Sequence, residues 1–182
     1  NESGIVAGDT LKIGNISDRG FVIDRQLTLM PLDNTSKISN GFIHLVKGSD
    51  GSTVSGLTIN NTKGALSING IYVGQLHGIW ITKSNNNTIV NNTIRIANAA
   101  GVYAMPMGWS SYNRIIGNDM STYITCVMVM GQCHYNIISK NKLETLDYND
   151  LIVSNLIYFN PFGHADYGGS PLCLGNVISD NY

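Results

Sequence analysis

Short apolar segments separated by Asn and Gly residues run along the whole chain. Five of them are bounded by Gly or Asn or lie next to them, at 70–73, 78–81, 101–104, 124–130 and 151–159. Such runs are typical of β-strands. No window as long as an average helix keeps a helical period with caps, and Asn and Gly are poor helix formers. The pattern therefore predicts an all-β chain.

One octet recurs: Asn, any residue, an apolar residue, two variable residues, Asn, any residue, an apolar residue. It starts at 87, 113, 136 and 176, and a degenerate copy at 52 has Ser52 and Leu57 in place of the two Asn. A still weaker copy ends at 26–29. The spacings are 35, 26, 23 and 40 residues, and the two shortest match one coil of a solenoid, about 20–30 residues. The longer two predict one coil with an inserted loop or, for the last, two short coils.

The repeated Asn residues predict hydrogen-bonded ladders. Coils stacked about 4.8 Å apart place equal residues above one another, so an Asn amide can donate to one Asn and accept from another. The corner residues of such coils often adopt the left-handed conformation, which Gly and Asn tolerate best. We predict two ladders, Asn87–Asn113–Asn136–Asn176 and Asn92–Asn118–Asn141–Asn181. The apolar members should stack inside, namely Ile89, Ile115, Ile138 and Ile178, and Ile94, Met120 and Leu143.

The composition excludes several classes of protein. Charged residues are 13% of the chain, against a usual ~25%, and the net charge is −1, so the basic surplus of a nucleic-acid binder is missing. The longest apolar stretches, such as 126–130, are far shorter than the ~20 residues of a membrane span. Three Cys are too few for a disulfide scaffold. The excess is in 22 Asn, 22 Ile and 20 Gly, the residues of the repeat itself.

These features resemble the right-handed parallel β-helix (pectin-lyase-like) superfamily. Segments 7–13 and 22–29 look like its first coils, and the octets are similar to the parallel β-helix repeats of adhesin-like surface proteins of methanogenic archaea. The resemblance implies one right-handed β-helix domain over 1–182, of about six to seven rungs. We expect degenerate coils over 1–50 and repeat coils over 51–182, with an inserted loop near 158–173. The chain opens without Met and ends inside an octet, so we expect a piece of a longer protein.

The same resemblance implies a non-enzymatic module outside the cell or on its surface, a stalk or an adhesin segment. Its expected partners are glycans or other surface proteins, and open coil ends would allow self-association. Six Asn-x-Ser/Thr sequons fit an extracellular location and start at Asn1, Asn15, Asn34, Asn60, Asn86 and Asn91.

The candidate ligand-binding residues lie mainly in the long interval between the last two octets. A sugar would stack on aromatic rings while Asp and His bond its hydroxyls. The candidates are Tyr158, His164, Asp166 and Tyr167, with Asp147 and Asp150 before them and Trp109 further along the solenoid. A packed surface loop is the alternative. Trp80 either faces outward or lies under a loop, and His44 and His77 are expected to be structural histidines with satisfied hydrogen bonds.

Two other functions stay open. A polysaccharide lyase needs clustered carboxylates for Ca²⁺, and a glycoside hydrolase needs paired carboxylates. Asp119 is the one carboxylate within the central octets, so we assign no catalytic residue. We expect no cofactor, and Ca²⁺ would be needed only if the chain were an enzyme of this kind. A copper-handling protein would need soft ligands. The alternating Cys126, Met128 and Met130 are more typical of a core face, and we assign no metal site.

Two cysteines share one offset from the repeat. Cys133 and Cys173 each lie three residues before an octet Asn. If their coils are adjacent, the Cα atoms are one rung apart, inside the ~4.4–6.8 Å window for a disulfide. We predict a Cys133–Cys173 bond; two stacked reduced thiols, or coils separated by a further rung, are the alternatives. Cys126 is expected to be buried and free.

Overall fold

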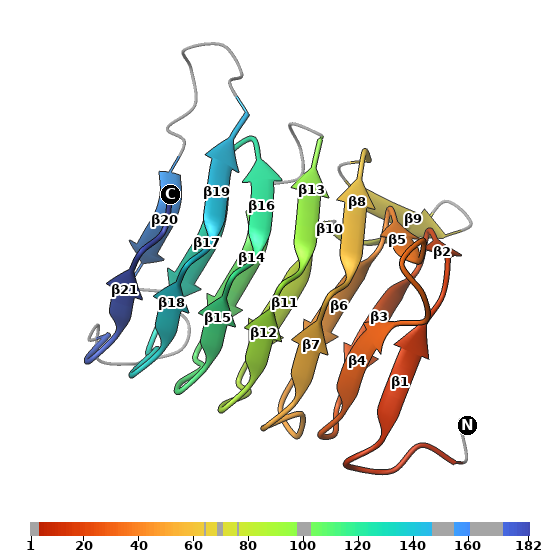
Figure 1. Cartoon of the computed structure of the whole chain (residues 1–182), viewed down its shortest axis with the longest axis horizontal. Helices are drawn as coiled ribbons and strands as arrows, with labels where there is room; N and C mark the ends of the chain where they lie inside the picture. Colours follow the sequence, from red (N-terminus) through yellow and green to blue (C-terminus); the bar gives the residue numbers. More distant parts are fainter. Residues whose placement is uncertain are drawn as a thin grey trace.

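A computed structural model of the chain describes residues 4–63, 65–68, 71–75, 77–97, 103–146, 155–160 and 173–182, with the backbone alone at 65–68, 71–75 and 155. These residues form strands and turns and no helix, so none of them belongs to a helix that could cross a membrane. The strands coil into a right-handed parallel β-helix, as the sequence predicts. Figure 1 shows the coils stacked in sequence order from β1 at one end to β21 at the other.

Three parallel sheets make the walls of the solenoid. Six described coils contribute one strand to each sheet, and β21 adds a seventh strand to sheet A. Sheet A contains β1 (Thr10–Ile13), β4 (Thr28–Pro31), β7 (Thr53–Ser55), β12 (Thr88–Val90), β15 (Arg114–Ile116), β18 (Ile137–Ser139) and β21 (Val177–Ser179). Sheet B contains β2 (Ile16–Ser17), β5 (Lys37–Ser39), β8 (Thr58–Asn61), β13 (Thr93–Ile96), β16 (Asp119–Thr122) and β19 (Lys142–Thr145). Sheet C contains β3 (Gly20–Ile23), β6 (Phe42–Leu45), β11 (Ile79–Thr82), β14 (Tyr103–Gly108), β17 (Thr125–Met130) and β20 (Asn155–Asn160).

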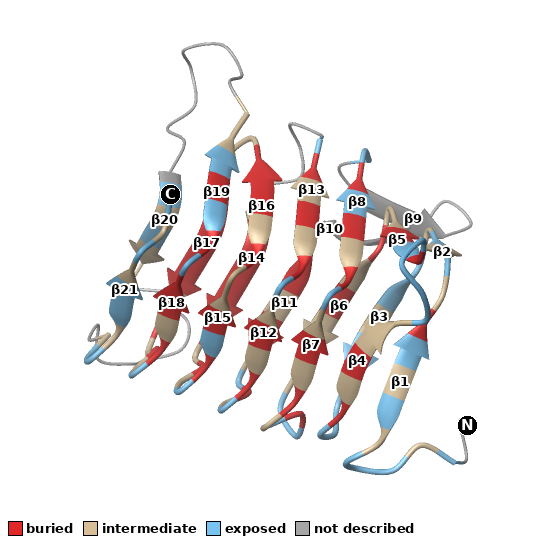
Figure 2. Cartoon of the chain, in the orientation of Figure 1, coloured by how far each residue is buried: buried red, intermediate tan, exposed pale blue. Residues whose placement is uncertain are grey.

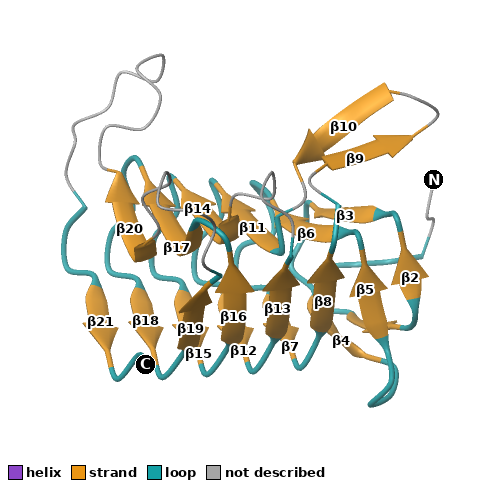
Figure 3. Ribbon diagram, turned by 90° about the horizontal axis from the view of Figure 1, so that it is seen from above, coloured by secondary structure: helices purple, strands orange, loops and turns teal. Residues whose placement is uncertain are grey.

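The long intervals of the repeat correspond to single coils with added segments. An antiparallel hairpin of β9 (Ala65–Ile68) and β10 (Ile71–Gln75) is inserted between β8 and β11. It projects outside the three sheets in Figure 3. Strand β18 pairs directly with β21 across the 40-residue interval, so the interval is one coil and not two.

Stacked apolar side chains fill the solenoid. The register pairs Ile89 with Ile115 and Ile115 with Ile138, and all three are fully buried. Ile94, Met120 and Leu143 form a second buried column, also as predicted. Each fully buried aliphatic side chain contributes about 1.5–3 kcal/mol, so these columns are the main source of stability. In Figure 2 the buried residues follow the middle of the stack, whereas Ile178 in the last described strand β21, which was also expected inside, is 49% exposed.

The hydrogen bonds confirm both Asn ladders. In the first, the side-chain Nδ2 of Asn87, Asn113 and Asn136 donates to Oδ1 of the next Asn at 2.9–3.2 Å. In the second, the corresponding distances from Asn92 to Asn181 are 2.9–3.0 Å. Each accepting Oδ1 also receives the backbone N–H of the Asn one rung earlier. The ladders flank sheet A, one at each end of its strands.

The left-handed corner residue is the one before each ladder Asn, whereas the sequence suggested the Asn itself. Asn91, Lys140 and Asp180 have φ of 54–56° before the second ladder, and Tyr112 and Tyr135 have φ of 60° and 53° before the first. None of the ladder Asn has a positive φ. The ladder Asn is therefore selected for its amide, and its neighbour carries the backbone strain.

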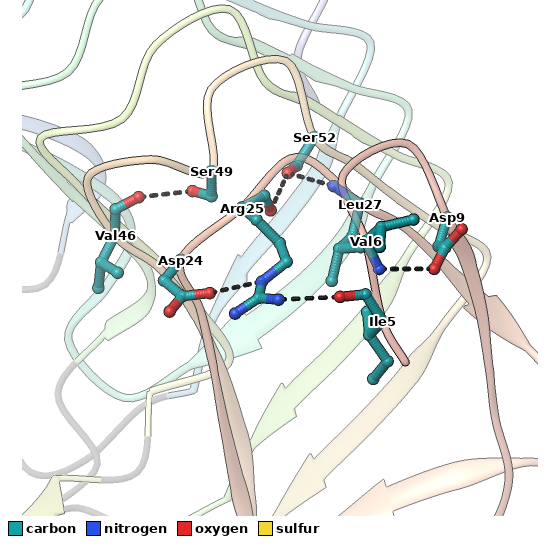
Figure 4. Close-up of polar contacts among 9 residues, drawn as sticks. All are labelled: Ile5, Val6, Asp9, Asp24, Arg25, Leu27, Val46, Ser49 and Ser52. Atoms are coloured by element: carbon teal, nitrogen blue, oxygen red, sulfur yellow. Dashed lines mark hydrogen bonds and ion pairs between the residues drawn. The ribbon is translucent and has the colours of Figure 1, made fainter. Parts of the chain in front are cut away.

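The first coils replace the ladder amide with a serine. Ser52 Oγ accepts the Leu27 backbone N–H at 3.0 Å, the bond that an Asn Oδ1 makes in later coils, and Ser52 N donates to Asn87 Oδ1. Figure 4 shows this corner, where Arg25 also binds the Ile5 carbonyl and Asp24. The degenerate copy at 52 therefore forms a regular coil, and the Ser52 hydroxyl continues the first ladder.

Candidate functional site

The outward side of sheet C carries one row of side chains that crosses all six strands. Its members occupy the middle position of aligned apolar strands such as Ile43-His44-Leu45 and Ile79-Trp80-Ile81. Because strand side chains alternate between faces, the residue between two core positions points outward. The row runs Val22, His44, Trp80, Pro106, Met128 and Tyr158. We call it the sheet C row.

Stacked rings form the middle of this row. His44 and Trp80 lie on adjacent strands with ring centroids 4.1 Å apart and planes at 6°. His77, just before β11, meets Trp80 edge-on at 5.3 Å and stacks with Tyr103 at 5.6 Å. Four rings from three coils therefore form one cluster, which we call the His–aromatic cluster.

Both histidines of the cluster are neutral at pH 7. Burial lowers the pKa of His44 and of His77 to about 4. His44 Nε2 lies 3.0 Å from Thr82 Oγ1, which fixes its ring beside Trp80. His77 is 6% exposed, and its Nδ1 is buried without a hydrogen-bond partner among the described residues. A buried polar atom without a partner is costly, so this nitrogen is an open acceptor position in the cluster.

The ends of the row are exposed. Val22 is 62% exposed and Tyr158 is 42% exposed, whereas Pro106 and Met128 between them are buried. Burial and the nearby Tyr158 raise the pKa of Tyr103, so the Tyr103 phenol is an uncharged hydroxyl at neutral pH. The sheet C row thus offers apolar rings with hydroxyl and imidazole groups and carries no charged residue.

Only part of the predicted ligand site lies in the described chain. Tyr158 is 42% exposed and lies at one end of the sheet C row, and its role in ligand binding stays a prediction. Trp109 lies at the corner after β14, with its ring against the Cα of Gly131 one coil further on, outside the row. The remaining candidates lie outside the described residues, namely Asp147, Asp150, His164, Asp166 and Tyr167.

A second aromatic group lines the corner between sheets C and A. Tyr112 and Tyr135 are 54% and 51% exposed, and their rings stack at 5.2 Å with planes at 16°. The other face of Tyr135 covers Gly175. The two rings therefore present their edges to solvent, and the stack offsets part of the strain of two left-handed tyrosines.

Ion pairs join some of the charged residues of the described chain. Asp119 on sheet B accepts a 2.7 Å bond from Arg95 and lies 3.9 Å from Lys142. No group of three His, Cys, Asp or Glu gathers for a metal among the described residues. Among the residues of the copper alternative, Met105 and Met107 are in the core with no exposed surface, and Cys126 is buried with its thiol directed at the Met120 and Glu144 carbonyls.

All three cysteines are free thiols in this structure, so the predicted Cys133–Cys173 disulfide is not formed in it. Cys126 is buried and free, as expected. The coils of Cys133 and Cys173 are adjacent, because the Tyr135 N–H donates to the Leu174 carbonyl and β18 pairs with β21. The prediction of adjacent coils is confirmed, and each thiol instead donates to a carbonyl of the turn after β17.

A comparison with protein families matches residues 11–182 to the family described as "Protein of unknown function (DUF1565)". The chain belongs to this family. DUF1565 is associated with parallel β-helix proteins, in agreement with the three parallel sheets. Comparisons with curated proteins and with solved structures gave no match.

Sequence reasoning missed the principal cluster of this DUF1565 chain. His44 and His77 were expected to be isolated and satisfied, yet they meet through Trp80, and His77 has an open nitrogen. The signal was the shared strand pattern, since Ile-His-Leu and Ile-Trp-Ile align once the hairpin is removed. Asn61 was also missed: it is fully buried and binds Gly41 N, Gly41 O and His77 O at the corner before β11.

Proposed function

We propose that this chain is a non-enzymatic, adhesin-like or structural β-helix module outside the cell, and that it binds a glycan along the sheet C row. The fold supports the scaffold role, because a solenoid of stacked coils presents long, straight surfaces. The His–aromatic cluster supports the binding role. Rings that stand beside hydroxyl and imidazole groups suit a sugar, which has apolar faces and hydroxyl edges.

The two exposed ends of the row lie far enough apart for a chain-like ligand. Six strands about 4.8 Å apart place Val22 and Tyr158 about 24 Å from each other, more than one sugar ring needs, and Pro106 and Met128 between them are buried. The row has no Lys, Arg, Asp or Glu, and both His44 in the row and His77 beside it are neutral, so we expect a neutral glycan in preference to a uronic acid polymer.

A glycan array followed by calorimetry with the best ligand tests this function. We expect Tyr158→Ala to weaken binding about tenfold, which corresponds to ~1.4 kcal/mol, and Trp80→Phe to weaken it less. Tyr182→Ala is the matched control, because Tyr182 is 75% exposed at the C-terminal coil and lies away from the row. An array that stays blank at high protein concentration would sink the binding role and leave the structural one.

The same ligands distinguish the enzyme alternative. Incubation with neutral and anionic polysaccharides, with and without Ca²⁺, should leave chain lengths unchanged. Release of reducing or unsaturated ends, lost in Asp147→Ala or Asp150→Ala, would replace the proposed module with a carbohydrate-active enzyme. Binding that increases with polymer charge would contradict the neutral ligand.

A further inference from the structure

A column of small polar side chains lies inside the corner between sheets C and A. The column position is three residues before the first-ladder position of each coil, and its members are Ser49, Ser84, Ser110, Cys133 and Cys173. Neighbours in the column touch: Ser49 Oγ lies 2.9 Å from Ser84 Oγ, and the Ser84 N–H donates to Ser110 Oγ at 3.2 Å. Ser49, where the column starts, is drawn in Figure 4.

The last two members replace the hydroxyl with a thiol. Ser110 N donates to Cys133 Sγ at 3.4 Å, so the first thiol takes the place that a serine oxygen holds one coil earlier. Cys133 Sγ donates to the Met130 carbonyl at 3.2 Å, and Cys173 Sγ donates to the adjacent Gly131 carbonyl at 2.9 Å. Both thiols are therefore directed at neighbouring residues of one turn.

The backbones on either side hold the two cysteines one coil apart. The Asn176 amide donates to the Cys133 carbonyl at 2.8 Å, and Leu174 N donates to His134 Nδ1 at 3.1 Å. No coil separates them, and a single spacing of about 4.8 Å lies within the Cα range of disulfides.

We infer that Cys133 and Cys173 are a redox pair, and that they close into a disulfide when the protein meets an oxidising pool of low-molecular-weight disulfides. The inference does not depend on the glycan site, because the pair lies inside a corner and not on the sheet C row. Closure would fasten the last described coil to the one before it.

The chemistry balances with glutathione disulfide as the oxidant. The thiolate of Cys173, the partly exposed thiol, attacks the oxidant, forms a mixed disulfide and releases one glutathione. The thiolate of Cys133 then attacks Cys173 Sγ, breaks the mixed disulfide and releases the second glutathione. Two protein thiols have lost two electrons, and the two glutathione molecules carry the electrons and the protons away.

The second step is expected to be slow. Burial raises the pKa of Cys133 to about 11, so few molecules carry its thiolate at neutral pH. The rate of closure should then rise about tenfold per pH unit between pH 7 and pH 9, because the thiolate fraction rises by that factor.

The bond would matter most for β21. Val177 and Ile178 in this strand are 51% and 49% exposed, and such terminal segments open most easily. We expect backbone amides of β21 to exchange with solvent at least tenfold more slowly in the oxidised protein than in the reduced one.

The full chain is first reduced, then equilibrated with glutathione disulfide, denatured at acidic pH and alkylated. We expect one alkylated thiol, Cys126, and a mapped peptide that joins Cys133 to Cys173. Cys173→Ser restores the serine of the column, should fold normally, and should show two free thiols and no slowed exchange in β21. Three free thiols in the folded, oxidised wild type, or a crosslink through Cys126 or between chains, would overturn the inference.

Discussion

The ladders and the sheet C row lie on the same coils and differ in every other respect. Four successive coils repeat Asn at both ladder positions, whereas the row changes its residue at each coil, from Val22 through His44 and Trp80 to Tyr158. Ladder amides are saturated with hydrogen bonds, for example Asn118 Nδ2 with Asn141 Oδ1 and the Ile89 carbonyl. The His–aromatic cluster leaves His77 Nδ1 without a hydrogen-bond partner in the described part of the chain. Repetition with full satisfaction marks the scaffold, and variation with an unsatisfied group marks the candidate site.

The largest expected effect is in the middle of a ladder. Asn113→Ala removes the acceptor of the Asn87 N–H and Nδ2 and the donor to Asn136 Oδ1. Because these buried groups cannot reach water, we expect a loss of about 4 kcal/mol in the free energy of unfolding, measured by urea denaturation. Asn176→Ala is the matched control in the last described coil, where Asn176 is partly exposed and water can replace its amide, and it should cost about 1 kcal/mol. Equal losses would show that ladder position is unimportant.

The His–aromatic cluster should instead affect how the free energy of unfolding depends on pH. The pKa of His77 is about 4 in the folded protein and about 6.5 when unfolded. Above pH 6.5 the titration of His77 therefore does not lower the free energy of unfolding. As the pH falls from 6.5 toward 4, the unfolded chain takes up a proton that the folded chain refuses, and stability decreases; below pH 4 this loss levels off.

Denaturation at pH 7 and pH 5 measures this effect, because most carboxylates keep their charge in that interval. We expect His77 to account for a loss of about 2 kcal/mol between the two values. His77→Gln should remove that share while leaving the loss due to His44 in place. An unchanged pH dependence in this variant would mean that His77 is not held neutral by burial.

The ladders could be predicted from sequence and the cluster could not, for a physical reason. Equal offsets in four octets impose equal surroundings on Asn87, Asn113, Asn136 and Asn176, so one coil predicts the next. The contact of His44 with Trp80 depends on a register that crosses the inserted hairpin, and neither residue repeats. The left-handed conformation of Tyr112 and Tyr135 could not be predicted either. This conformation favours Gly and Asn, and only the stacking of the two rings supports Tyr there.

The smallest effect concerns a single corner residue of the second ladder. Lys140 is exposed with φ of 56°, at the position that Asn91 occupies two coils earlier with φ of 54°. An L-residue other than Gly, Asn or Asp is disfavoured in this conformation, so Lys140→Asn should raise the free energy of unfolding by about 0.5–1 kcal/mol. Lys142→Asn, in the adjacent strand β19, removes the same charge without the backbone benefit and should not stabilise. If Lys140→Asn were no more stable than this control, the left-handed corner would carry no backbone strain. The identity of the residue before each ladder Asn would then be unrelated to the backbone conformation of that residue.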